Sequence, residues 1–92
     1  MGNYKKNVRE INSAKNIFIK YLKDNNAECI DYDKPEVSNE WDYYCVVSGF
    51  INDILYTVYF MVWHCDLSIY YSDDYNHYNK LSVYDFLQLI GK

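Results

Sequence analysis

The run ILYTVYFMVW, residues 54–63, restricts the fold of this chain more than any other stretch. Its ten residues are too few to cross a bilayer as a helix, and β-branched and aromatic side chains dominate it, which favours a strand. Side chains on a strand alternate between its two faces, and here both faces are apolar. The run therefore predicts a central strand that is covered on most of both faces.

Turn signals and alternating patterns predict further strands around this run. Residues 41–50 lead into it through IND (51–53), whose Asn and Asp favour a tight turn, so the two strands should form a hairpin. After the run, HCD (64–66) either bends the strand or turns the chain into the next one. The other predicted strands are 27–33 and 67–72, with loops at 34–40 and 73–80.

Helices are predicted near both ends of the chain. Residues 7–25 carry an apolar stripe at three- and four-residue spacing. DNN (24–26) should end this helix, because Asn tolerates the left-handed conformation that is common at helix ends. Ser82 and Asp85 resemble a capping box that starts a short second helix, which Gly91 closes.

The order of these elements predicts a single α+β domain over residues 1–92, with residues 1–6 as a flexible tail. The expected fold is an N-terminal helix, a four-stranded antiparallel meander and a short C-terminal helix. Each helix has one apolar stripe to bury, so both helices should lie on the same face of the sheet. Half of the residues are apolar, which is ample for one core.

Cysteine usage and the start of the chain predict a cytoplasmic protein. An odd number of widely spaced cysteines is a poor disulfide framework, so Cys29, Cys45 and Cys65 are expected to be free and mostly buried thiols. The opening MGNYKKNVRE lacks the apolar segment of a secretory signal. We therefore expect a cytoplasmic chain that does not bind a membrane.

Motifs that carry catalytic chemistry are not found in the sequence. It has no G-x-S-x-G, no H-E-x-x-H and no glycine-rich phosphate loop. His64, Cys65 and Asp66 are adjacent, so on a strand they point to alternating faces and do not converge on a metal. We therefore predict that the protein is not an enzyme and has no catalytic residue, no metal and no cofactor.

Charge is divided unevenly along the chain. Residues 1–23 hold six basic side chains and one acid, whereas residues 24–92 hold twelve acids and three lysines. On a strand, Asp31 and Asp33 would project to one side about 6.7 Å apart, close to the advance of about 6.8 Å over two phosphate steps of DNA. This acidic region is either ordinary solvated surface or a site for a basic partner. Its acids are Asp24, Glu28, Asp31, Asp33, Glu36, Glu40 and Asp42.

Tyrosine is unusually common, with twelve residues in the chain. The stretch YYSDDYNHYNK (70–80) contains four of them, and tyrosine is enriched at protein interfaces. This stretch is either a contact loop or a hairpin closure whose rings pack over the sheet edge. The candidates for exposure are Tyr70, Tyr75 and Tyr78, with Tyr43 or Tyr44 on the neighbouring strand.

Together these features predict a small acidic binding protein that inhibits a basic, nucleic-acid-handling protein through an acidic, tyrosine-rich surface. Direct nucleic-acid binding is not expected, because the acidic part of the chain would repel phosphates. A homodimer is compatible with the sequence. The predicted partner-binding residues are Asp31, Asp33, Glu36, Glu40, Asp42, Tyr70, Asp73, Asp74, Tyr75 and Tyr78.

In composition, and in the stretches NNAECIDYDKPEVSNEWD (25–42) and YYSDDYNHY (70–78), the chain resembles the small phage-encoded inhibitors of bacterial defence, including anti-CRISPR proteins. The resemblance implies nucleic-acid mimicry in the cytoplasm of a bacterial host cell, and it carries over no functional residue. The α-β-β-β-β-α order is also similar to small chaperone-like α+β folds that dimerise and hold partner segments. Such a scaffold, with mainly apolar contacts, is the alternative function.

Overall fold

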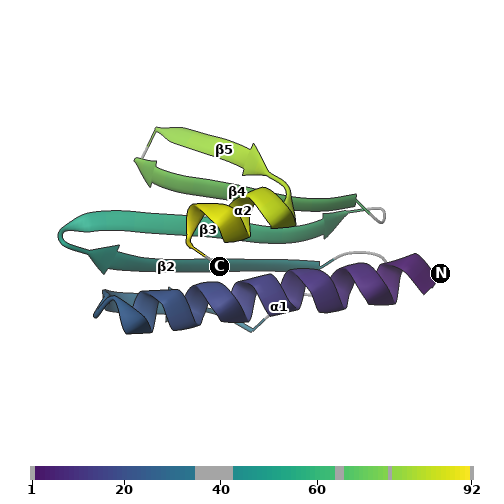
Figure 1. Ribbon diagram of the computed structural model, residues 1–92, viewed down its shortest axis with the longest axis horizontal. Coiled ribbons are helices and arrows are strands. Elements are labelled where there is room, and N and C mark those ends of the chain that lie inside the picture. Colours follow the sequence, from purple (N-terminus) through teal and green to yellow (C-terminus); the bar gives the residue numbers. More distant parts are fainter. Residues whose placement is uncertain (1, 35–42, 64–65, 75, 92) are drawn as a thin grey trace.

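The computed structural model describes residues 2–34, 43–63, 66–74 and 76–91. It is an α+β fold with a long N-terminal helix, an antiparallel sheet and a short C-terminal helix (Figure 1). The elements, in chain order, are α1 (Gly2–Asp24), β1 (Glu28–Tyr32), β2 (Tyr43–Ile51), β3 (Ile54–Trp63), β4 (Asp66–Asp74), β5 (His77–Leu81) and α2 (Val83–Leu89).

The sheet is a meander of five strands in the order β1-β2-β3-β4-β5, so the prediction of four strands was wrong. The segment 73–80 was expected to be a loop, but β4 extends to Asp74 and β5 pairs with it antiparallel. Four of the five β5 side chains are exposed, so this edge strand lacks the apolar alternation that marks a strand in a sequence. Pairing of its backbone with β4 forms it instead.

The turns between the central strands follow their local residues. Asn52 and Asp53 have positive φ angles of 51° and 67°, as a two-residue hairpin turn of type I′ requires, and Ile51 pairs with Ile54. This confirms the hairpin between β2 and β3. β3 pairs antiparallel with β4, so the chain turns between them rather than continuing as one bent strand. His64 and Cys65 lie outside the described residues.

Helix α1 begins at Gly2, five residues before its predicted start, so residues 2–6 are helical where a tail was expected. Its buried stripe is Ile11, Ala14, Phe18 and Leu22, at the predicted spacing. At its C-terminal end, Asn26 has a φ of 56°, and the Ala27 N–H donates to the Leu22 carbonyl at 2.9 Å. This is a Schellman motif, and it confirms that DNN ends the helix.

Helix α2 is capped by Ser82, whose hydroxyl accepts the Asp85 N–H at 3.0 Å. Gly91 follows its end with a φ of 79°, as predicted. The fully buried Phe86 of α2 meets Phe18 of α1 and Phe60 of β3, at ring-centroid distances of 5.6 and 5.5 Å. Both helices therefore lie on one face of the sheet, which confirms that prediction.

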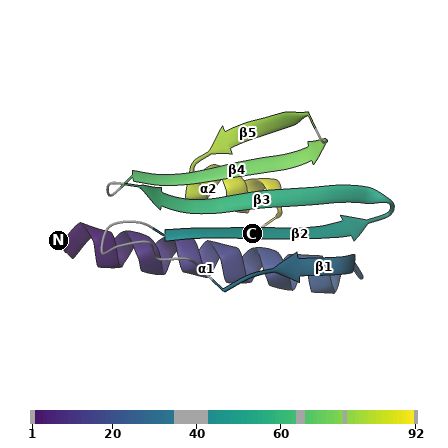
Figure 2. The same ribbon diagram turned by 180° about the vertical axis from the view of Figure 1, so that it is seen from behind.

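The core lies between this face of the sheet and the two helices. Its sheet residues alternate along the strands, with Val47 of β2 opposite Val58 of β3, and Phe60 opposite Ile69 of β4. Seen from behind, the strands stand in front of both helices, and no described element covers their other face (Figure 2). β3 is central, but the prediction that it is covered on most of both faces was wrong. None of the helices in the described ranges is long and apolar enough to cross a membrane.

Candidate functional site

The candidate site is the sheet face that points away from the helices, called here the open face. Its members follow from the register, because residues that alternate with the buried ones point to the opposite side. The open face carries Tyr44, Val46, Ser48 and Phe50 from β2, Leu55, Thr57, Tyr59, Met61 and Trp63 from β3, Asp66, Ser68, Tyr70 and Ser72 from β4, and Tyr78 and Lys80 from β5.

A tyrosine cluster occupies the middle of the open face. The ring of Tyr59 on β3 lies 6.1 Å from the ring of Tyr44 on β2 and 5.4 Å from that of Tyr78 on β5. A hydrogen bond with Tyr59 raises the pKa of the Tyr78 hydroxyl, and burial adds to this shift. Contacts between rings on three strands hold these side chains in place.

The rings of the open face are partly buried, and contacts with neighbouring rings bury them. Trp63 is 57% exposed, Tyr78 45% and Tyr44 38%. Met61, Tyr59 and Tyr70 of the same face are each half-buried. Contiguous exposed apolar surfaces are typical of sites where proteins contact other proteins. Tyrosine, tryptophan and methionine are also the residue types that are enriched at the centres of protein interfaces.

The described acids of the predicted site lie at two separate places. Asp31 on β1 is exposed and pairs with Ser48 on β2, so it borders the open face. The exposed Asp33 follows two residues later. Asp73 and Asp74 lie at the end of β4, three strands away, or roughly 14 Å at the usual strand spacing. Tyrosine side chains, not carboxylates, fill the space between these two acidic edges.

The second acidic place is a local turn. The register shifts between Tyr71 and Asp74, and the Ser72 hydroxyl accepts the Asp74 N–H at 3.1 Å. The Asp74 carboxylate lies 3.2 Å from Nδ1 of His77, so protonated His77 forms an exposed ion pair with it. Asp74 therefore lies beside His77 within the β4–β5 hairpin.

Among the predicted contact residues, Tyr70 and Tyr78 both lie on the open face. Of the alternatives Tyr43 and Tyr44, the exposed one is Tyr44. The hydroxyl of buried Tyr43 donates to Asn12 Oδ1 at 3.0 Å, and burial raises the pKa of that hydroxyl to about 12. Glu36, Glu40, Asp42 and Tyr75 lie outside the described residues.

Sequence reasoning missed most of the open face, because it assigned the apolar residues of β3 to the core. Leu55, Met61 and Trp63 are the clearest cases. A signal was present: both predicted helices were expected on one face of the sheet, and no further element was predicted to cover the other. When a central strand is apolar on both faces and all helices lie on one side of the sheet, the other apolar face of that strand is left uncovered.

The described thiols differ in exposure. Cys45 is buried, and its sulfur lies 3.4 Å from the Asp33 carbonyl oxygen; burial is the main cause that raises the pKa of this thiol. Cys29 is free and exposed on β1, contrary to the expectation that the thiols are mostly buried. No three metal-ligating side chains come together among the residues that the structure describes.

A hollow of about 340 Å³ lies where α1, β1 and the β2–β3 turn meet, and its lining residues are Asn25, Asn26, Glu28, Phe50, Asn52 and Asp53. Most of these side chains are exposed and polar, so the hollow lacks the apolar walls of a small-molecule site. The open face, in contrast, presents apolar and aromatic side chains from several neighbouring strands.

Protein-family models, curated proteins and solved structures were all compared with the chain, and none of them matched.

Proposed function

We propose that this chain is a non-catalytic binding protein that docks another protein surface on its open face. The observation that carries the proposal is the uncovered row of aromatic and aliphatic side chains over β2, β3 and β4. Leaving such a surface in water is unfavourable by about 25 cal/mol per Å² of apolar area, so covering it favours association. This is the apolar scaffold class of function.

A protein partner fits this face better than a nucleic acid does. Lys80 is the one basic residue among the described members of the open face, so phosphates would meet little positive charge there. Tyrosine rings and hydroxyls suit a protein surface, since they combine a large apolar area with hydrogen bonding at low entropic cost.

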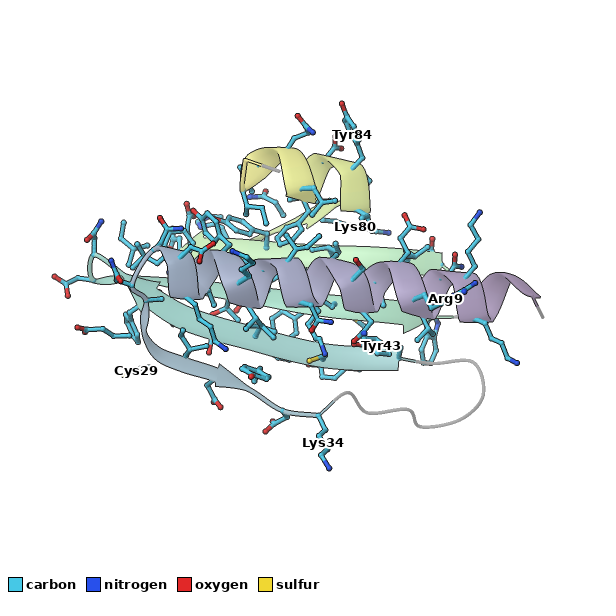
Figure 3. The ribbon with its side chains drawn as sticks, turned by 60° about the horizontal axis from the view of Figure 1, so that its bottom comes forward. Arg9, Cys29, Lys34, Tyr43, Lys80 and Tyr84 are labelled. Carbon is cyan, nitrogen blue, oxygen red and sulfur yellow. The ribbon has the colours of Figure 1, made fainter. Side chains whose placement is uncertain are left out.

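Site-specific photo-crosslinking in cells tests the proposal. A photoreactive phenylalanine analogue at Tyr70 lies on the open face, and the same analogue at Tyr84 is the matched control. Tyr84 is 70% exposed and projects from α2 away from the sheet (Figure 3). We expect discrete protein adducts from position 70 and far fewer from position 84. Adducts from position 84 alone would assign binding to the helical side and contradict the proposal.

A second candidate is inhibition of a basic, nucleic-acid-handling partner through the β1 edge. It is favoured by the exposure of Asp31 on β1 and of Asp33 just after it, because β1 pairs only with β2 in the described sheet. Carboxylate contacts weaken steeply as salt rises, whereas apolar contacts do not. If binding to a captured partner falls steeply with salt and with Asp31→Lys or Asp33→Lys, the edge is the site. If binding is insensitive both to salt and to these substitutions, the open face is the site.

A further inference from the structure

We infer that the occupant of the open face is a second copy of this chain, related by a twofold axis that runs parallel to the strands. This inference rests on the proposed function, because it uses the same face as the docking surface, and it adds the identity of the partner. Its support comes from the size of the face, from the placement of charge at its two edges, and from the residues at its centre.

The size of the open face matches what a stable dimer needs. Its longest strand has ten residues and the sheet has five strands. At about 3.3 Å per residue and about 4.8 Å per strand, the face measures roughly 33 by 24 Å. Allowing for the short edge strands, each copy would bury roughly 600 Å², or about 1,200 Å² in all, at the lower end of the range of specific interfaces.

Charge is placed at opposite ends of one row across the open face. The register aligns Val46 with Tyr59, Tyr59 with Tyr70, and Tyr70 with Lys80. Asp31 pairs with Ser48 and Tyr32 with Val47, which places Asp33 beside Val46 at the β1 end of the same row. Asp33 and Lys80 are thus four strand spacings apart, about 19 Å, and cannot pair within one chain.

Two twofold axes stack the open faces with their strands aligned, and charge separates them. An axis perpendicular to the strands would place each β1 edge on the β1 edge of the other copy, so the acids Asp31 and Asp33 would lie against acids of the same edge. An axis parallel to the strands exchanges the edges, so Asp33 of each copy faces Lys80 of the other. The second arrangement gives Asp33 a partner of opposite charge, whereas the first places it among acids, so we choose the parallel axis.

The centre of the face also suits this arrangement. Tyr59 and Met61 of β3, in the middle strand, would lie at the axis and meet their equivalents in the second copy. Exchanging β2 and β4 places the large Tyr44 over the small Ser68, because Met61 pairs with both in one row. Large side chains over small ones let two sheets interdigitate at their usual separation of about 10 Å.

Sedimentation or light scattering over a concentration series tests the inference. We expect a particle of about twice the 11.1 kDa chain mass, and the full chain should be mostly dimeric by about 200 μM if its Kd is micromolar. Tyr59→Lys brings two ammonium groups together at the axis and should leave only monomer. Tyr84→Lys, the same change on the helical side, should stay dimeric. Circular dichroism checks that each variant is folded.

Charge exchange at the edges tests the axis, even if Tyr59→Lys fails to fold. Lys80→Glu alone should weaken the dimer roughly tenfold, because two attractions become repulsions, and Asp33→Lys alone should do the same. The double variant should recover most of the loss. Since these residues are too far apart to pair within one chain, recovery requires contact between copies. No recovery would overturn the parallel axis.

The remaining outcomes separate this inference from the proposed function. A chain that stays monomeric at about 200 μM overturns the second copy as occupant. If position 70 then crosslinks a different protein, the open face is still the docking surface and only the partner was wrong. If the Tyr59→Lys variant still forms the dimer and position 70 yields no adduct, both this inference and the proposed function are overturned.

Discussion

Replacing Phe86 by Ala should remove a large part of the stability of this protein. Phe86 is fully buried, and its ring lies 5.6 Å from Phe18, 5.5 Å from Phe60 and 6.3 Å from Tyr71. It joins α2 to α1 and to the sheet. Loss of a buried phenylalanine costs about 3–5 kcal/mol, whereas a domain of 92 residues has a total stability of about 5–14 kcal/mol. The variant should therefore be marginally folded.

Urea unfolding followed by far-UV circular dichroism measures this effect. With an m-value of about 2 kcal/mol/M, a loss of about 4 kcal/mol lowers the midpoint by roughly 2 M. The matched control is Leu89→Ala on the same helix. Leu89 is 55% exposed, so its truncation should change stability by less than about 1 kcal/mol. If the two variants lose the same stability, or Phe86→Ala loses less than about 1 kcal/mol, α2 does not pack as described.

Three further predictions follow from buried groups. Val58→Asp places an unpaired charge in the core and should unfold the chain, so a normal thermal midpoint would contradict this packing. Burial raises the pKa of Tyr43 from 10.0 to about 12, so its contribution to stability is complete below pH 10 and is lost as the pH rises toward 12. Urea unfolding between these pH values should show that decline, and Tyr43→Phe should reduce it. In the native chain Cys29 should react rapidly with a thiol reagent and Cys45 slowly, while the unfolded chain should show three free thiols.

The candidate site was predictable only in part. Tyr70 and Tyr78 were expected to be exposed from their position in a tyrosine-rich stretch, and both lie on the open face. Trp63 and Met61 were missed, because an apolar residue in a strand has the same sequence pattern whether a helix covers it or water does. The acids near Asp31 and Asp73 looked like one surface in the sequence, but the strand order separates them by most of the sheet width.

Local features of this protein were determined by the sequence alone. The β2–β3 turn, the end of α1 and the start of α2 depend on residues within a few positions of each other, such as Asn52, Asn26 and Ser82. Their conformations follow from backbone sterics and from side-chain hydrogen bonds to nearby amides, so adjacent residues suffice to predict them.

Tertiary structure decided the fifth strand and the identity of the uncovered face. Backbone hydrogen bonds to β4 hold β5 in place. Such bonds form whatever the side chains are, so the polar sequence of β5 does not reveal that it is a strand. Whether β3 is buried on one face or two depends on where both helices pack. Phe18 of α1 and Phe86 of α2 meet on the same side of the sheet, so both helices bury the same face. No described element covers the other face, which has Tyr59 at its centre.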